Sequence, residues 1–243
     1  MEFVDYKCLE SLLIEGEEIA TEGLADKAKS IFSKVINVLK TFLKYVINMI
    51  KKMIMTIKNK IKTKGKSYTV ELHLKPSEVL DIVDEARNYS SSLQSLINEI
   101  YGLNGGTMSE DKIHDYVNKL RDYQDSVIEK ARQFHNKYNG EDYSITASAA
   151  DTLLRSLYDT QQKFEVAYDK VNKMAMMALD MSLSGQNAET FNNMYSIMST
   201  FAAGIQQISK ALTQVNAVVI NAKYDYGKDQ VTDSNGNVIK TMN

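Results

Sequence analysis

The chain of 243 residues contains a single proline, Pro76, and only 11 glycines. Proline and glycine are the strongest breaks in regular structure, and folds built from many short strands need such turn residues at frequent intervals. Their scarcity argues against all-β and α/β folds. It favours a small number of long helices instead.

Cysteine is nearly absent as well. The lone Cys8 excludes a disulfide within the chain and any paired-cysteine metal or redox motif, and it fits a reducing compartment. The acidic start MEFVDYKCLESLLIEGEE lacks the basic residues and compact apolar stretch of a secretory signal. The longest lysine-free piece of the basic region, Tyr45 to Ile50, is far too short to span a bilayer, and we expect neither a signal peptide nor a transmembrane segment.

Acidic residues are missing from one long stretch. Residues 27–66 carry 12 lysines and no aspartate or glutamate, whereas residues 1–26 carry eight acidic residues and the single base Lys7. The formal net charge of −2 is therefore a cancellation between oppositely charged segments. Such asymmetry suggests an anionic partner, a membrane surface, or an acidic mask supplied by the chain itself.

The basic stretch also has a helical period. Its apolar residues recur at spacings of three and four, from Ile31 to Ile61, which predicts one amphipathic helix from Asp26 to about Lys64. The candidate residues for contact with an anion or a membrane lie on or beside its polar face: Lys34, Lys40, Lys44, Lys51, Lys52, Lys58 and Lys62.

Three interpretations of this helix remain open, and they are not mutually exclusive. Its apolar stripe can pack on the rest of the protein and leave the lysines in solvent. Alternatively, the helix can lie in a membrane interface, where lysine-rich amphipathic helices bind. In the third interpretation the lysines neutralise nucleic-acid phosphates, which gives salt-dependent binding without sequence preference.

The remainder predicts a mostly α fold, an elongated bundle of long antiparallel helices. Further helices are expected at about 77–101, 109–139, 145–183 and 187–225. The alternating segment 67–74 predicts a strand, and the Asn-Gly turn near residue 235 predicts a C-terminal hairpin within 229–241 that can pair with it. We expect an acidic leader or connector at 1–25, a basic helical arm at 26–65, and at 66–243 the bundle with its small β element.

Motifs that carry chemistry are missing from the sequence. His73, His114 and His135 have no metal-ligand spacing, and no nucleophile elbow, P-loop or dinucleotide-binding glycine motif occurs. We therefore expect no catalytic, cofactor-binding or metal-binding residues, no cofactor, and no enzymatic activity.

The segment LESLLIEGEEIATEG (residues 9–23), followed directly by a lysine-rich helix, resembles the leader of internal head proteins of large tailed bacteriophages. The resemblance implies that the leader directs the protein into the prohead. It also implies cleavage by a head protease after Glu15, before Gly16, because Leu13 and Ile14 precede that glutamate. Cleavage there would change the net charge from −2 to +1.

These observations lead to two functional hypotheses. The first is a non-enzymatic structural or assembly protein of a phage virion, located in the virion or the host cytoplasm. It would act through helix packing and the lysine-rich helix, with self-association, other virion proteins and non-specific nucleic acid as partners. The alternative is a membrane-active protein with a pore-forming or ejection role, which binds an anionic membrane surface through residues 27–64.

Overall fold

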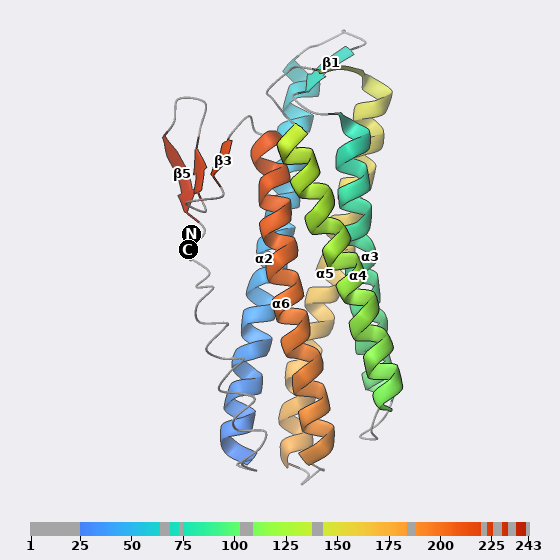
Figure 1. The fold of residues 1–243 in the computed structure, drawn as a ribbon, viewed down its shortest axis with the longest axis vertical. Coiled ribbons are helices and arrows are strands. Elements are labelled where there is room, and N and C mark those ends of the chain that lie inside the picture. The colour runs from blue at the N-terminus through green and yellow to red at the C-terminus, as the bar shows by residue number, and fades with distance from the viewer. Residues whose placement is uncertain are drawn as a thin grey trace.

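The computed structural model describes residues 25–63, 69–72, 75–102, 109–137, 143–183, 188–219, 223–225, 230–232 and 237–241. They form an elongated bundle of five long helices with two small sheets (Figure 1). The helices are α2 (Ala25–Thr63), α3 (Pro76–Gly102), α4 (Glu110–Lys137), α5 (Ala147–Leu183) and α6 (Ala188–Val219). The strands are β1 (Thr69–Leu72), β2 (Tyr143–Thr146), β3 (Lys223–Asp225), β4 (Gln230–Thr232) and β5 (Val238–Thr241). The predicted mostly α helical bundle is confirmed.

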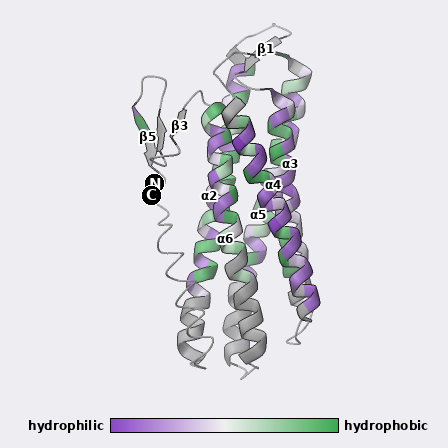
Figure 2. Ribbon diagram, in the orientation of Figure 1, coloured by the Kyte–Doolittle hydropathy of each residue, from purple (hydrophilic) through white to green (hydrophobic). Residues whose placement is uncertain are grey.

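The five helices form a ring. Each helix packs chiefly against two others, in the order α2, α5, α3, α4, α6 and back to α2. The hydrophilic and hydrophobic residues alternate in bands along α3 and α4 (Figure 2), as expected for helices that bury one face. The apolar faces meet in one continuous hydrophobic core, to which all five helices contribute.

Successive helices run in opposite directions along the long axis (Figure 1), but helices that follow each other in the chain are not always neighbours. As a result, the pairs α2–α5 and α3–α4 are antiparallel, whereas α3–α5, α4–α6 and α2–α6 are parallel. The expectation of antiparallel packing therefore needs correction for these three pairs. An odd number of helices cannot alternate in direction all the way around a ring.

Helix α2 is part of the bundle core. Its apolar stripe is covered by α5 and α6, and the side chains from Val35 to Ile57 that form it are no more than 6% exposed. These residues belong to the same hydrophobic cluster as those of the other helices. Within the described residues, the packing shows no boundary between a basic arm and the bundle. Of the three interpretations of this helix, the structure shows the docked one.

The β structure differs from the predicted pairing. Strand β1 falls within the expected segment 67–74, but it pairs antiparallel with β2, with Thr69 opposite Thr146, and not with the C-terminal segment 229–241. Residues 145 and 146, predicted to start a helix, belong to β2. The C-terminal hairpin is confirmed as β4 and β5, and β3 extends it to three strands because α6 ends at Val219 instead of residue 225.

A buried tyrosine spans the centre of the ring. Tyr89 of α3 is 1% exposed, and its hydroxyl donates a hydrogen bond of 3.3 Å to the carbonyl oxygen of Phe201 in α6. The two rings pack edge to face, with centroids 6.5 Å apart. Gly204, one turn further along α6, allows this approach, because a Cβ there would lie 2.4 Å from the Tyr89 hydroxyl oxygen.

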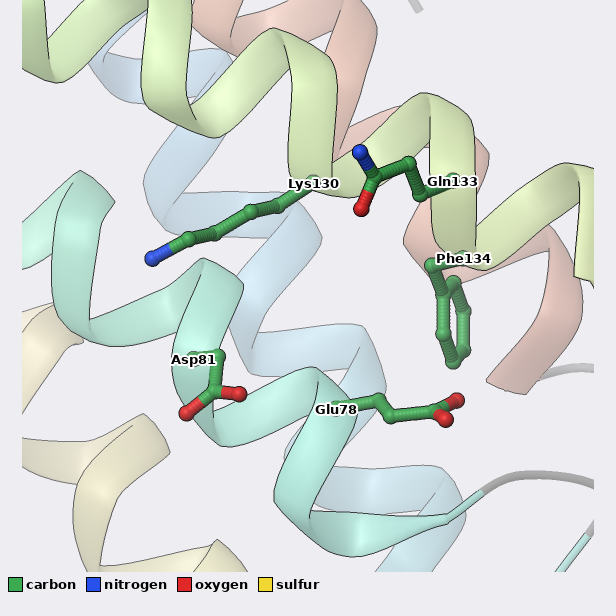
Figure 3. A pocket seen from close by; sticks show the side chains of 5 residues that line it. All are labelled: Glu78, Asp81, Lys130, Gln133 and Phe134. Carbon is green, nitrogen blue, oxygen red and sulfur yellow. The ribbon is translucent and has the colours of Figure 1, made fainter.

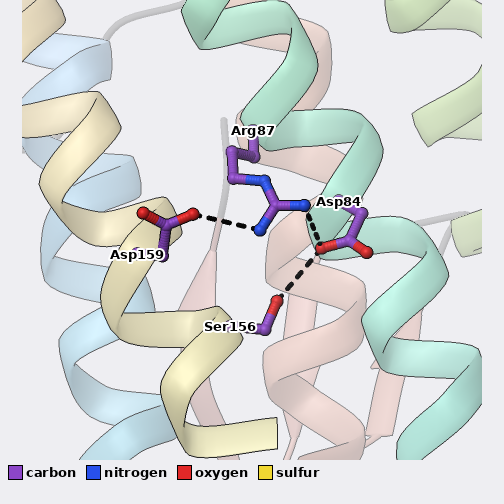
Figure 4. A network of polar contacts seen from close by, with 4 residues as sticks. All are labelled: Asp84, Arg87, Ser156 and Asp159. Atoms are coloured by element: carbon purple, nitrogen blue, oxygen red, sulfur yellow. Dashed lines mark hydrogen bonds and ion pairs between the residues drawn. The ribbon is translucent and has the colours of Figure 1, made fainter. Parts of the chain in front are cut away.

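Polar side chains connect the parallel helices α3 and α5 along the outer edge of their interface. Arg87 forms ion pairs of 3.0 Å with both Asp84 and Asp159, and the Ser156 hydroxyl donates to Asp84 (Figure 4). Further along, the Gln94 amide donates to the main-chain oxygen of Lys163 over 2.8 Å. The contacts of Arg87 with Asp159 and of Ser156 with Asp84 join residues 72 positions apart, and the Gln94 contact joins residues 69 apart, so together they fix the register between α3 and α5.

Candidate functional site on the outer face of α2

The outer face of α2 is the side that the bundle does not cover. Successive residues of an α-helix are rotated by about 100°, so this face is assembled from positions spaced by three, four and seven residues. Lys40, Lys44, Lys51 and Lys58 fall within an arc of roughly 40°, next to α5. Lys34 and Lys52 share a second line, roughly 80–120° away, on the side of α6.

Two lysines of the first line contact α5. The Lys51 ammonium lies 3.0 Å from a Glu165 carboxylate oxygen, and this hydrogen-bonded lysine holds the pKa of Glu165 below its usual value of 4.5. The Lys58 ammonium lies 4.8 Å from the centroid of the Tyr158 ring, a cation–π contact. The α5 edge of the face is thus partly engaged by the bundle itself.

Lys44 and Lys52 project into solvent, and Lys40 is partly exposed. Lys40, Lys44 and Lys52 take part in no ion pair with the described residues, and Lys34, Lys44 and Lys52 are exposed. The α6 side contributes little opposing charge, because Glu189 is the only acidic residue within the sequence of α6. This part of the surface therefore carries positive charge without a compensating carboxylate from the adjacent helix.

The sequence-predicted candidates divide accordingly. Six of the seven lysines have described side chains, and they lie on or beside one face as predicted; the side chain of Lys62 lies outside the described residues. Glu15 and Gly16, the expected cleavage position, also lie outside them. Glu165 and Tyr158 were not anticipated, because periodicity within α2 gives no information about which helix packs beside it.

A separate pocket of about 240 Å³ lies between the first turns of α3 and the last turns of α4 (Figure 3). Its lining residues are Glu78, Asp81, Lys130, Gln133 and Phe134. The Lys130 ammonium is already held by Glu85 at 2.7 Å, which lowers the pKa of Glu85, and Phe134 is a core residue. The pocket is a groove between two packed helices, and its lining contains no nucleophile next to a base.

The described residues contain no group of three or more His, Cys, Asp or Glu side chains that could hold a metal ion. Among the helices of the same residues, none combines the length and the apolar character that a membrane span requires. What the outer face of α2 offers chemically is an array of ammonium groups on a rigid support, suited to multivalent contact with an anionic surface.

Comparison of the chain with protein-family models, with curated proteins and with solved structures gives no significant match. Function must therefore be argued from the fold and from the surface just described.

Proposed function

We propose that this protein is a non-enzymatic structural or assembly protein of a tailed-phage particle. It would act through the packing of its long helices and through the lysine-bearing outer face of α2. The observation that carries the proposal is the position of α2 in the ring: its apolar stripe is buried, and its lysines remain outside. The assignment to a phage particle is supported by the leader resemblance at Leu13, Ile14, Glu15 and Gly16.

The burial of α2 favours this role over the membrane-active alternative. An interfacial helix binds lipid by burying its apolar face in the headgroup region, yet the stripe of α2 already contacts α5 and α6. Insertion would require α2 to leave the ring and would uncover the apolar surfaces that it now covers, at roughly 1.5–3 kcal/mol for each large side chain. The docked helix therefore presents its lysine side chains, and not its apolar face, to a binding partner.

Two measurements test the proposal. Mass spectrometry of particles purified from the natural source is expected to detect this chain, with Gly16 as its first residue after leader cleavage. Light scattering coupled to size exclusion is expected to show self-association of the purified protein. Absence of the chain from purified particles would contradict the virion role, and a strictly monomeric protein would contradict assembly through its own copies.

Flotation with vesicles tests the membrane-active alternative against the structural role. If the protein floats with anionic vesicles and loses protection of α2 amides from hydrogen exchange on binding, α2 leaves the ring and the membrane-active role replaces the structural one. If α2 amides stay protected, the helix remains docked, as proposed.

A further inference from the structure

We propose that the outer face of α2 binds the phosphate backbone of duplex nucleic acid without reading its sequence. This inference rests on the assembly role proposed above and names its partner. The face is defined by six exposed or partly exposed lysines of one helix: Lys34, Lys40, Lys44, Lys51, Lys52 and Lys58. Charge complementarity is the first argument, since the only acidic residue in the sequence of α2 is Asp26, at its N-terminal end.

The arrangement of the lysines supplies the second argument. The line from Lys40 to Lys58 extends over roughly 27 Å at 1.5 Å per residue, and the line of Lys34 and Lys52 runs beside it. Between the two lines lies a strip with exposed Asn37, Thr41 and Asn48. The Thr41 hydroxyl already donates to the main-chain oxygen of Asn37 over 2.9 Å, but the asparagine side chains can donate hydrogen bonds to phosphate oxygens, whereas lysines supply the charge. The face thus combines both kinds of backbone contact.

The rigidity of the support is the third argument. Leu39, Leu43 and Ile50 on the opposite side of the helix are fully buried in the core, so the ammonium groups project from a fixed axis. A lysine carries its charge on a compact ammonium group at the end of a flexible side chain. It lacks the planar guanidinium group with which arginine recognises bases through two hydrogen bonds. This chemistry predicts contacts that follow the backbone and ignore the sequence.

The surface also discriminates between anionic partners. Proteins that bind single strands stack bases on aromatic side chains, but the described part of α2 exposes no aromatic ring strongly, and Lys58 already lies over Tyr158 of α5. A membrane-binding helix exposes a broad apolar face, whereas Met55 is the only large hydrophobic side chain of α2 that is exposed in the described residues. A duplex fits the face better than either.

Fluorescence anisotropy with a labelled duplex of arbitrary sequence, over a series of salt concentrations, tests the proposal on the full chain. The affinity is expected to fall as salt rises, with a log–log slope of roughly 0.9 for each phosphate neutralised. The variant K40Q/K44Q/K52Q is expected to lower the slope by up to about 2.7. The matched control K119Q/R121Q/K163Q removes the same charge from α4 and from the α3-facing side of α5, and is expected to retain most of the slope.

The outcomes separate cleanly once circular dichroism has shown that both variants are folded. A loss confined to the α2 variant supports the proposal. Equal losses in both variants, a slope near zero, or tighter binding to vesicles with anionic lipid than to the duplex would overturn it. Self-association measured by light scattering tests the assembly role independently. A protein that assembles but ignores DNA would refute only this inference.

Discussion

Gly204 is the position at which the absence of a side chain matters most to the fold. The Tyr89 hydroxyl and the Gln124 amide oxygen both lie within 3.0 Å of the place where a Cβ would stand. Three helices, α3, α4 and α6, therefore meet at one small residue. The hydroxyl of Tyr89 is buried, and this burial raises its pKa well above the ordinary value.

Replacement of Gly204 by alanine is expected to destabilise the protein by about 1–3 kcal/mol, because overpacking forces buried neighbours to shift. Urea unfolding followed by circular dichroism measures the change. The control Gly102→Ala, where a Cβ would meet no atom within 4 Å, is expected to change stability by less than about 0.5 kcal/mol.

A double-mutant cycle sharpens this test. In Tyr89→Phe the hydroxyl is gone, so alanine at position 204 should cost less than it does with tyrosine present, and the coupling should have a stabilising sign. If the two costs simply add, the contact between Gly204 and the Tyr89 hydroxyl does not limit the packing.

The lowered pKa values of two carboxyl groups predict how the free energy of unfolding changes with pH. A hydrogen bond from Lys130 lowers the pKa of Glu85 below 4.5, and one from Lys51 lowers the pKa of Glu165 in the same way. The unfolded chain then binds more protons below pH 4.5, so these groups contribute stability above the unfolded pKa and lose it as pH falls through the folded pKa.

The loss of stability at low pH should depend more on Glu85 than on Glu165. The Glu85 side chain is 22% exposed and the Glu165 side chain 42% exposed, and solvent screens the more exposed pair. Unfolding free energies measured between about pH 3 and pH 6 are expected to show a flatter pH dependence in Glu85→Gln than in Glu165→Gln. The reverse order would show that exposure does not control these contributions.

At the scale of elements, α2 contributes as much to the core as any other helix does. Leu43→Ala is expected to cost about 2–5 kcal/mol because it leaves a cavity in a fully buried site. Fluorescence of the tyrosines, including Tyr89 in α3, should report the same lowered unfolding midpoint as circular dichroism. Lys44→Ala, on the exposed side of the same turn, serves as the control. Two separate transitions in Leu43→Ala would instead indicate an independent arm.

Element positions followed well from the sequence because they depend on local pattern. The spacing of apolar residues placed α2, α3 and α4 within one or two residues of their observed ends. Strand β2 was missed, because Tyr143–Thr146 is short and directly precedes a strongly helical pattern. The partner of β1 was also missed. Strand pairing depends on which chain segments meet in space, and neither strand carries a signal that names the other.

At the scale of the molecule, helix neighbours could not be predicted. Each helix has a broad apolar face that fits several partners, and the choice of α5 and α6 for α2 depends on the whole ring. The site was foreseen in part for the same reason. The lysines of α2 share a face because of helical geometry, whereas Glu165 and Tyr158 reach them only through the packing of α5.

Net charge gives a prediction for the molecule as a whole. Residues 1–24 carry seven acidic residues and Lys7, so their removal changes the formal net charge from −2 to +4. Less long-range repulsion should strengthen binding to a duplex at low salt, and the gain should vanish as salt shortens the range of the field. Anisotropy titrations of both chains measure it. Unchanged low-salt affinity would contradict this electrostatic argument.

The pairing of β1 with β2 has a mechanical consequence. These strands lie in the α2–α3 and α4–α5 connections, so main-chain hydrogen bonds join two turns at the same end of the molecule (Figure 1). Within the described residues, no strand pair joins the turns at the other end. Thermal fluctuations that separate neighbouring helices should therefore increase in amplitude with distance from the β1–β2 pair.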